Sequence, residues 1–228
     1  FNHLTKALLL PDMEFFVSLH DWCEIDTLEA PIEKSVPIFT FSKIKNYILP
    51  VLIPDPEMLL GYNEVDALLD AHEKAVPWES KCEKAFWRGA TSSGSFDLPE
   101  WRLFPRVRLV YESLKCPNET DARFSKLIQG ASTNAEFLAQ PELIGDELSI
   151  KDSLKYKYFI DVDGNACTYS RFYWILRSQS VPFKHQSSFI QWYYKGLKPF
   201  EHYVPIKEDF SDLSEQVKWA RAHDNEVK

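Results

Sequence analysis

Short apolar runs that end in polar or proline-containing turns recur along this chain and predict a series of β-strands. The predicted strands cover residues 15–19, 36–41, 49–53, 85–87, 180–183 and 203–206. Longer stretches place apolar residues at helical spacing and predict helices over 63–75, within 101–114, near 187–194 and after Ser211 or Asp212. Because strands alternate with helices, the pattern predicts an α/β fold.

A proline-containing polar stretch at 77–81 divides this pattern into two parts. We therefore expect two lobes, an N-terminal lobe over 1–80 and a C-terminal lobe over 81–228. Within the second lobe, Pro105 marks the expected first turn of a helix, and 117–150 predicts short strands and turns.

The most informative stretch is KYKYFIDVDGNACTYSRF, residues 155–172. It predicts a buried strand, a tight turn with acidic residues and a glycine, and a helix with Arg171 in its first turn. A helix N-terminus presents unpaired N–H groups and partial positive charge, and an arginine adds a planar set of donors. This combination favours a diphosphate and predicts a site for a nucleotide-linked substrate.

Composition narrows the class of protein. The 228 residues are 45% hydrophobic, enough for a substantial core, and the net charge of -8 argues against a general nucleic-acid-binding protein. No apolar run approaches the ~20 residues that a membrane-spanning helix needs. The four cysteines are scattered without metal-site spacing, so we expect buried or free thiols. Because the chain begins with Phe1 rather than Met, we expect it to be part of a longer protein.

Two arginine-containing segments are candidates for phosphate contacts, and each also has an ordinary structural explanation. The segment 88–92 follows a strand, and its glycine would let backbone N–H groups approach a phosphate; a solvated loop is the alternative. Arg102 and Arg106 lie four residues apart and share one helix face if the helix already includes Arg102. That face would line a phosphate pocket or form surface ion pairs.

The acidic pair Asp161 and Asp163 allows two interpretations. A D-x-D pattern offers carboxylates to a divalent cation, whereas acidic residues in a turn also cap the following helix. The spacing excludes an EF-hand loop beginning at Asp161, and we favour capping. His20 and Asp21 follow a strand, so Asp21 is either a general base at a ligand-binding edge or an ordinary turn residue. His202 is either a ligand contact or, more commonly, a histidine hydrogen-bonded inside the fold.

Five segments in series resemble glycosyltransferase family 90. They are LPDMEFFVSLHD (10–21), PIFTFSK (37–43), KAFWRGATSSG (84–94), KYKYFIDVDGNACTYSRF (155–172) and LKPFEHYVPIKEDFSDL (197–213). The family includes Rumi-type protein O-glucosyltransferases, fungal capsule-associated xylosyltransferases and bacterial lipopolysaccharide A proteins. The form with FWRGAT and IDVDGNA resembles the bacterial and fungal branches more than the animal Rumi branch.

The resemblance implies a GT-B-like fold, with two Rossmann-like lobes and the donor site in the cleft. It places the catalytic base of the N-terminal, acceptor-side lobe at Asp21. In the C-terminal, donor-binding lobe it implies donor contacts from Arg88, Gly89, Thr91, Ser92, Gly164, Asn165, Tyr169 and Arg171. We add Arg106 and Asp163 as donor contacts from the arginine and acidic segments described above. The animal serine after Arg-Gly is Ala90 here, so Thr91 or Ser92 would supply that hydroxyl. The loop before Arg171 is also one residue longer than in the family.

The resemblance further implies an inverting, metal-independent glycosyltransferase that uses a UDP-sugar as co-substrate and no other cofactor. Glucose or xylose would pass to a hydroxyl on a glycan, lipopolysaccharide or protein. The alternatives are a non-catalytic sugar-nucleotide or glycan binding module, and a metal-dependent transferase that uses Asp161 and Asp163. Neither a nucleic-acid partner nor a membrane span in this chain is expected. The compartment would be the cytoplasm in a bacterium and the endoplasmic reticulum or Golgi lumen in a eukaryote.

Overall fold

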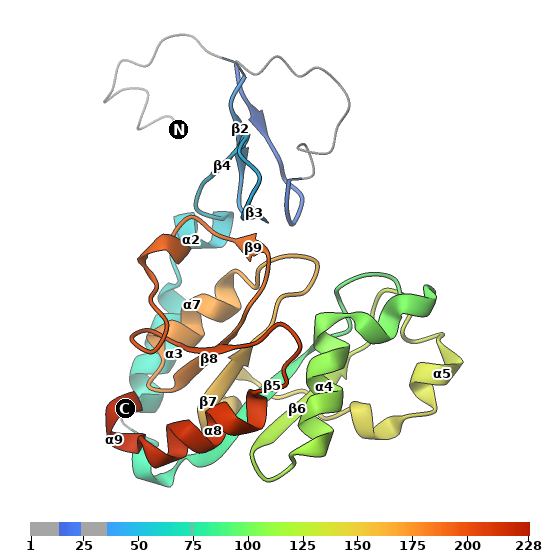
Figure 1. The fold of residues 1–228 in the computed structure, drawn as a ribbon. Coiled ribbons are helices and arrows are strands. Elements are labelled where there is room, and N and C mark those ends of the chain that lie inside the picture. Colours follow the sequence, from blue (N-terminus) through green and yellow to red (C-terminus); the bar gives the residue numbers. More distant parts are fainter. Residues whose placement is uncertain (1–13, 24–35, 74) are drawn as a thin grey trace.

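The structure, a computed structural model, describes residues 14–23, 36–73 and 75–228. It has a mixed α/β fold, which confirms the predicted class. Figure 1 shows a small sheet at one end of the molecule and a larger sheet in its body, with helices around the larger sheet. Both of these sheets are parallel.

The small sheet has the strand order β1–β2–β4. Its strands are β1 (Phe16–Val17), β2 (Ile38–Thr40) and β4 (Pro50–Leu52). Each lies inside a predicted strand and is shorter than predicted. The end of β2 shows why: the Thr40 hydroxyl donates a hydrogen bond to the Ser42 carbonyl at 2.9 Å, and this side-chain bond competes with strand continuation.

Two helices connect the small sheet to the larger one. The first, α2 (Pro56–Leu60), follows the predicted strand 49–53 and was not among the predicted helices. Asp55 accepts a capping hydrogen bond from the backbone N–H of Met58 at 3.1 Å, and Pro56 lies in the first helical turn. The second, α3 (Asn63–Glu73), confirms the helix predicted in this region.

The larger sheet has the strand order β10–β8–β7–β5–β6. Its strands are β5 (Cys82–Ala90), β6 (Thr120–Lys126), β7 (Tyr156–Asp161), β8 (Val181–His185) and β10 (Val204–Ile206). Every residue of β7 is buried, as expected for a central parallel strand covered on both faces. Strand β5 is longer than predicted, because its pairing with β6 continues to Ala90. The predicted loop therefore begins after Ala90 rather than at Arg88.

Helices and 3₁₀ turns surround this sheet (Figure 1). The remaining α-helices are α4 (Pro105–Lys115), α5 (Ala135–Leu138), α6 (Ile150–Ser153), α7 (Ser170–Arg177), α8 (Leu213–Ala222) and α9 (Asp224–Val227). The 3₁₀ turns are η2 (Trp78–Ser80), η3 (Pro99–Leu103), η4 (Pro141–Leu143) and η5 (Tyr194–Gly196). Pro105 opens α4 and Asp212 precedes α8, which confirms both predicted helix starts. Helix α3 packs against α6 and α7; the lobe boundary near residue 80 stays a prediction.

The helix predicted near 187–194 is wrong over most of its length. Strand β9 (Phe189–Ile190) lies there instead and pairs antiparallel with β3 (Lys43–Ile44). The Ser187 hydroxyl accepts a hydrogen bond from the Phe189 N–H at 2.9 Å, and the Ser188 carbonyl accepts from the Lys45 N–H at 2.7 Å. These contacts hold the segment extended and join it to the N-terminal part of the chain.

A hydrophobic core lies on each face of the larger sheet. Neighbouring residues of β5 face opposite sides, as a strand requires. Trp87 belongs to the larger cluster, which includes Phe124 and residues of α4 and α8. Phe86 belongs to the smaller cluster, with Phe159 of β7 and Trp174 of α7.

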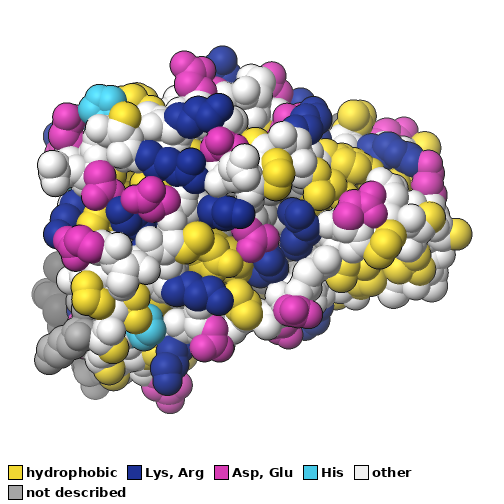
Figure 2. Space-filling view, turned by 90° about the horizontal axis from the view of Figure 1, so that it is seen from below, with side chains coloured by type: hydrophobic (Ala, Val, Ile, Leu, Met, Phe, Trp, Pro, Cys, Tyr) yellow, Lys and Arg dark blue, Asp and Glu magenta, His cyan; other side chains and the backbone are white. Residues whose placement is uncertain are grey.

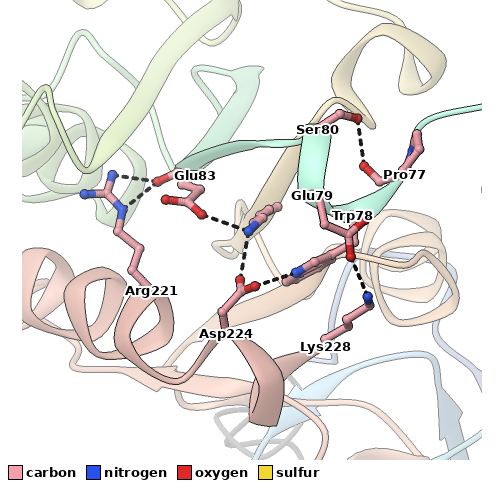
Figure 3. A network of polar contacts seen from close by, with 9 residues as sticks. Pro77, Trp78, Glu79, Ser80, Glu83, Arg221, Asp224 and Lys228 are labelled. Atoms are coloured by element: carbon pink, nitrogen blue, oxygen red, sulfur yellow. Dashed lines mark hydrogen bonds and ion pairs between the residues drawn. The ribbon is translucent and has the colours of Figure 1, made fainter.

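A polar network fastens the C-terminal helices to the sheet (Figure 3). The ammonium group of Lys157, on β7, donates to Glu83 Oε1 and to Asp224 Oδ1, both at 2.8 Å. Asp224 also accepts from the Trp78 indole N–H at 2.9 Å. Arg221 donates to the Glu83 carbonyl from two guanidinium nitrogens, at 2.9 and 2.6 Å. The start of α9 and the end of α8 are thereby tied to β5 and β7.

The face seen from below in Figure 2 carries basic and acidic side chains side by side, with hydrophobic side chains among them. Interspersed charges of both signs avoid a large field of one sign on this face. None of the helices in the described part of the chain has the length and apolar character needed to cross a bilayer.

Candidate active site

The candidate site is a pocket between the segment after β1, helix α2 and the turn that joins β7 to α7. Its volume is about 530 Å³. The pocket brings together residues that the sequence predicted for the site: Asp21, Ser92, Arg106, Gly164, Asn165 and Tyr169. His20 also lines it, beside Asp21.

Asp21 follows β1, and its exposed side chain meets the β7–α7 turn. Its Oδ2 accepts a hydrogen bond from Asn165 Nδ2 at 3.1 Å, and the Tyr169 hydroxyl donates to its backbone carbonyl. Gln129 Nε2 donates to Asn165 Oδ1 at 3.0 Å, so the NH₂ end of that amide faces Asp21. The predicted base therefore lies directly against the predicted donor turn, although the two are far apart in the sequence.

Arg106, in the first turn of α4, contacts three groups around the pocket. Its Nε donates to the Asp163 carbonyl at 3.2 Å, and its Nη1 donates to the Ala90 carbonyl at 2.9 Å and to the Ser92 hydroxyl. Burial, followed by the neighbouring charge of Arg171, lowers the pKa of this guanidinium to about 10. A bound anion would relieve the repulsion between the two arginines.

A second pocket of about 420 Å³ shares Arg106 with the first and contains Arg88 and Arg171. Arg171 lies in the first turn of α7, and burial lowers the pKa of its guanidinium. Arg88 is held by Asp121, which its Nη2 contacts at 2.9 Å, but its Nε is buried without a partner among the described residues. Aromatic side chains form another part of the lining: Phe86, Phe159 and Trp174. This pocket suits an anionic ligand that also has an apolar or aromatic portion.

Gly89 and Thr91 support β5 and its loop rather than face the pocket. A Cβ atom at Gly89 would lie 2.5 Å from the Trp87 indole, so glycine lets that ring pack against the strand. The Thr91 hydroxyl donates to the Ile128 carbonyl and accepts from the Ile128 N–H, each at 2.8 Å. Of the two candidate hydroxyls after Arg-Gly, it is Ser92 that lines the pocket.

The turn between β7 and α7 allows close approach. A Cβ atom at Gly164 would lie 2.5 Å from Ser92 Oγ and 2.8 Å from Arg106 Nη2, so glycine lets both side chains contact the turn. Tyr169 precedes α7 with a φ of 37°, a left-handed conformation that is uncommon for a residue with a side chain. Burial, with nearby Cys167 and Asp21, raises the pKa of its phenol. Backbone strain of this kind concentrates at functional sites.

Asp161 and Asp163 bind Lys184 instead of capping α7, so the favoured interpretation of this pair is wrong. Lys184 Nζ donates to Asp161 Oδ2 at 2.6 Å and to Asp163 Oδ1 at 3.1 Å. Thr168 donates to the other oxygen of Asp161, and Ser187 donates to the other oxygen of Asp163. Burial opposes the charge on Lys184, but the two carboxylates hold its pKa well above the usual value. Asp163 reaches the pocket's edge through its carbonyl, which Arg106 contacts.

Other residues singled out from the sequence lie elsewhere. Because α4 begins at Pro105, Arg102 lies in η3 and pairs with Glu136. The idea that Arg102 and Arg106 share one helix face is therefore wrong. His202 accepts a hydrogen bond from the Lys198 N–H at 3.1 Å in an exposed turn. Within the described ranges, no group of three or more His, Cys, Asp or Glu is arranged to hold a metal ion.

Asp55 and Gln129 contribute to the site although the sequence did not assign them to it. Asp55 lines the pocket from the N-cap of α2; its position between two prolines indicates a turn as readily as a helix start. Gln129 has a φ of 54°, and its Oε1 accepts from the N–H groups of Ser93 at 3.2 Å and Gly94 at 3.3 Å. Nothing in the sequence marks a glutamine for this bridging role.

Comparison with known proteins supports the resemblance seen in the sequence. Residues 1–228 match the model of the family described as Glycosyl transferase family 90. The chain is 32% identical over 234 residues to Protein O-glucosyltransferase 2 of Danio rerio, covering 99% of this chain and 43% of that protein. It is 32% identical over 230 residues to Protein O-glucosyltransferase 3 of Homo sapiens, covering 99% of this chain and 42% of that protein.

A similar match is found to Protein O-glucosyltransferase 1 of Rattus norvegicus, with 29% identity over 231 residues, 95% of this chain and 54% of that protein. This chain thus spans about half the length of these curated relatives. The matches run through both the segment that carries Asp21 and the turn that carries Arg171, because they cover nearly all of the chain.

Proposed function

This chain belongs to glycosyltransferase family 90, and on that premise we propose that it transfers a sugar from a UDP-sugar to a hydroxyl group of a protein. One observation carries the proposal: the Asp21 carboxylate, the turn before α7 and Arg106 line a single pocket. Transfer needs a base for the acceptor hydroxyl and, opposite to it, cationic groups for the leaving diphosphate. The two-lobed GT-B arrangement with its donor cleft is part of this proposal.

The donor half of the proposed site is formed by Arg106, Arg171 and the first turn of α7. Guanidinium groups match phosphate oxygens with paired donors, and a helix N-terminus adds partial positive charge. Burial lowers the pKa of both arginines, and the charge of Arg171 lowers that of Arg106 further; a bound diphosphate would offset both effects. The aromatic side chains of Phe86 and Phe159 in the adjoining pocket suit the nucleoside.

In the proposed reaction, Asp21 accepts the proton of the acceptor hydroxyl. The oxygen then attacks the anomeric carbon from the face opposite the diphosphate, which inverts the configuration. Among the described residues, Asn165 hydrogen-bonds to this carboxylate through Oδ2, which leaves Oδ1 for the incoming proton. Arg106 and Arg171 stabilise the negative charge that develops on the leaving nucleoside diphosphate.

We propose that the reaction needs no divalent metal. The carboxylates of Asp161 and Asp163 both pair with Lys184, which lies between them, and their remaining oxygens accept hydrogen bonds from Thr168 and Ser187. Positive charge for the diphosphate comes from arginine side chains instead. Transfer is therefore expected to proceed at an unchanged rate in excess EDTA.

The relatives' names favour glucose as the sugar and a protein as the acceptor, since each is called a protein O-glucosyltransferase. Glucose and xylose differ by one hydroxymethyl group, and a small change in a pocket selects between such donors. Both sugars therefore belong in the first test.

The test combines binding and turnover. The protein is titrated calorimetrically with UDP, UDP-glucose, UDP-xylose and, as a control, GDP-mannose, and UDP release is followed with protein acceptors and with EDTA. We expect UDP and one of the two UDP-sugars to bind, with UDP release that EDTA does not slow. A folded protein that binds no uridine nucleotide would overturn the proposal, and tight donor binding without UDP release would indicate a binding module.

A further inference from the structure

Asp55 places a buried carboxylate in the pocket that Asp21 lines. The residue is only 4% exposed, and its Oδ1 accepts the capping hydrogen bond from the Met58 N–H. Its Oδ2 is buried and accepts no hydrogen bond from any described residue. Folded proteins rarely leave a buried carboxylate oxygen without a donor, because the desolvation is not offset. Oδ2 is therefore suited to a donor that a ligand brings.

Neighbouring hydroxyl groups do not complete the hydrogen bonds of Asp55. The Tyr62 hydroxyl is also buried and without a hydrogen-bond partner among the described residues. Burial, then the charge of Asp55 and, as a smaller effect, a weak hydrogen-bonding interaction with Asp55 raise the pKa of Tyr62, so this hydroxyl lies beside the carboxylate although outside regular hydrogen-bond geometry. The Tyr169 hydroxyl donates to the Asp21 carbonyl. A ligand hydroxyl in regular geometry would compete with the Tyr62 hydroxyl for this carboxylate oxygen.

The position of Asp55 in the pocket favours a sugar over a phosphate. Ser92, Arg106 and Gly164 line the end assigned to the diphosphate, and Asp21 marks the reacting carbon. Asp55 and Glu57 contribute further lining, from the start of α2. Two carboxylates there repel a phosphate, whereas a sugar hydroxyl is a neutral donor that a carboxylate accepts well.

We infer that Asp55 is a specificity-determining residue, whose Oδ2 accepts a hydrogen bond from one ring hydroxyl of the donor sugar. The inference rests on the proposed function. It goes beyond that function because it assigns the choice of donor sugar to α2, an element the sequence did not predict. A buried acceptor discriminates against a donor that lacks the matching hydroxyl, since the carboxylate oxygen then stays unpaired.

Two substitutions separate this role from the capping of α2. Serine caps helices about as well as aspartate, so Asp55→Ser keeps a capping oxygen but removes the second carboxylate oxygen. Asp55→Asn also keeps the cap and replaces Oδ2 with an amide that donates. Glu64→Gln, an exposed acid of α3 outside the described pockets, is the control for lost negative charge, and Tyr62→Phe tests whether the tyrosine is the true partner.

The experiment measures dissociation constants of UDP and UDP-glucose by calorimetry for each variant, with thermal unfolding to confirm that each is folded. We expect Asp55→Ser to bind UDP within about twofold of the wild type and UDP-glucose about 10- to 100-fold more weakly, the range for a hydrogen bond to a charged group. Asp55→Asn should be intermediate. Glu64→Gln and Tyr62→Phe should bind both ligands like the wild type.

Deoxy analogues of UDP-glucose identify the hydroxyl. One analogue should bind the wild type about as weakly as Asp55→Ser binds UDP-glucose, and should bind both proteins equally. If folded Asp55→Ser and Asp55→Asn both bind UDP-glucose like the wild type, the inference is overturned while the proposed function stands. If Tyr62→Phe loses as much affinity as Asp55→Ser, the carboxylate serves the tyrosine and the inference is likewise overturned. A wild type that binds neither ligand overturns the proposed function and this inference with it.

Discussion

Replacing Asp21 with asparagine removes the charge of the proposed base but keeps an oxygen that accepts from Asn165 Nδ2. A general base contributes about 10²–10⁴ in rate, so we expect Asp21→Asn to lower turnover by that factor. Affinity for UDP should stay within about twofold, because the nucleotide contacts come from Arg106 and Arg171. Steady-state UDP release and calorimetric titration check the two parts. Asp146→Asn, an exposed aspartate outside the described pockets, is the matched control, and near-wild-type turnover in Asp21→Asn would contradict the role of base.

Single residues were predictable where their chemistry belongs to a local motif. Arg171 follows a strand and a turn in the sequence, and the structure finds it in the first turn of α7. The partners of such residues were not predictable, because they come from distant parts of the chain. Asn165 contacts Asp21, and Thr91 turns its hydroxyl to Ile128, through tertiary contacts that no spacing encodes.

The β7–α7 turn tests the site at the level of an element. A Cβ atom at Gly164 would meet the movable ends of Ser92 and Arg106 rather than backbone, so Gly164→Ala should fold with little loss of stability. The two side chains must shift, however, and we expect UDP to bind on the order of tenfold more weakly, the loss of about one charged hydrogen bond. Calorimetry with UDP measures this. Gly196→Ala is the control, since nothing lies within 4 Å of a Cβ there, and equal affinities in both variants would contradict the prediction.

Elements were predictable in proportion to their length and burial. Strand β7 and helix α7 follow from a fully buried run and an amphipathic stretch. Strands β3 and β9 are only two residues long, too short to show an alternation of apolar and polar residues. They are strands because they pair with each other, which the sequence does not reveal. Helix α2 was not predicted because Pro54 and Pro56 are also typical of a turn. The helix start is recognisable only from the structure, where the Met58 N–H donates to the Asp55 side chain.

At the scale of the whole molecule, the proposed site depends on contacts between the N-terminal segments and the body. Strands β3 and β9 pair, the rings of Trp22 and Phe189 lie 5.6 Å apart, and those of Tyr62 and Tyr173 stack at 3.9 Å. The sequence predicted the α/β class but could not place Asp21 over the β7–α7 turn, since that placement is the sum of these contacts. The proposed site can therefore form only when the larger sheet and the helices around it are stably folded.

The network around Lys157 tests that stability (Figure 3). Asp224→Asn should lower the free energy of unfolding at pH 7 by about 1 kcal/mol, or the melting temperature by about 2–4 °C, because Lys157 is buried and loses one of its two carboxylates. The expected loss of stability is small because the Asp224 side chain is 36% exposed.

The same pair predicts a pH dependence. Burial raises the pKa of the Asp224 carboxyl, but hydrogen bonds from Lys157 and Trp78 outweigh it and lower this pKa. Because the pKa of Asp224 is lower in the folded protein than in the unfolded protein, where it is about 3.9, the ionised carboxylate stabilises the fold above that pH. This stabilisation is lost as the pH falls through the folded-state pKa. Melting temperatures measured as the pH falls from 7 should therefore show a constant gap between wild type and variant down to about pH 4, and the gap should narrow below that pH. A gap that does not narrow below about pH 4 would contradict this account, and Glu142→Gln, an exposed acid, should show none.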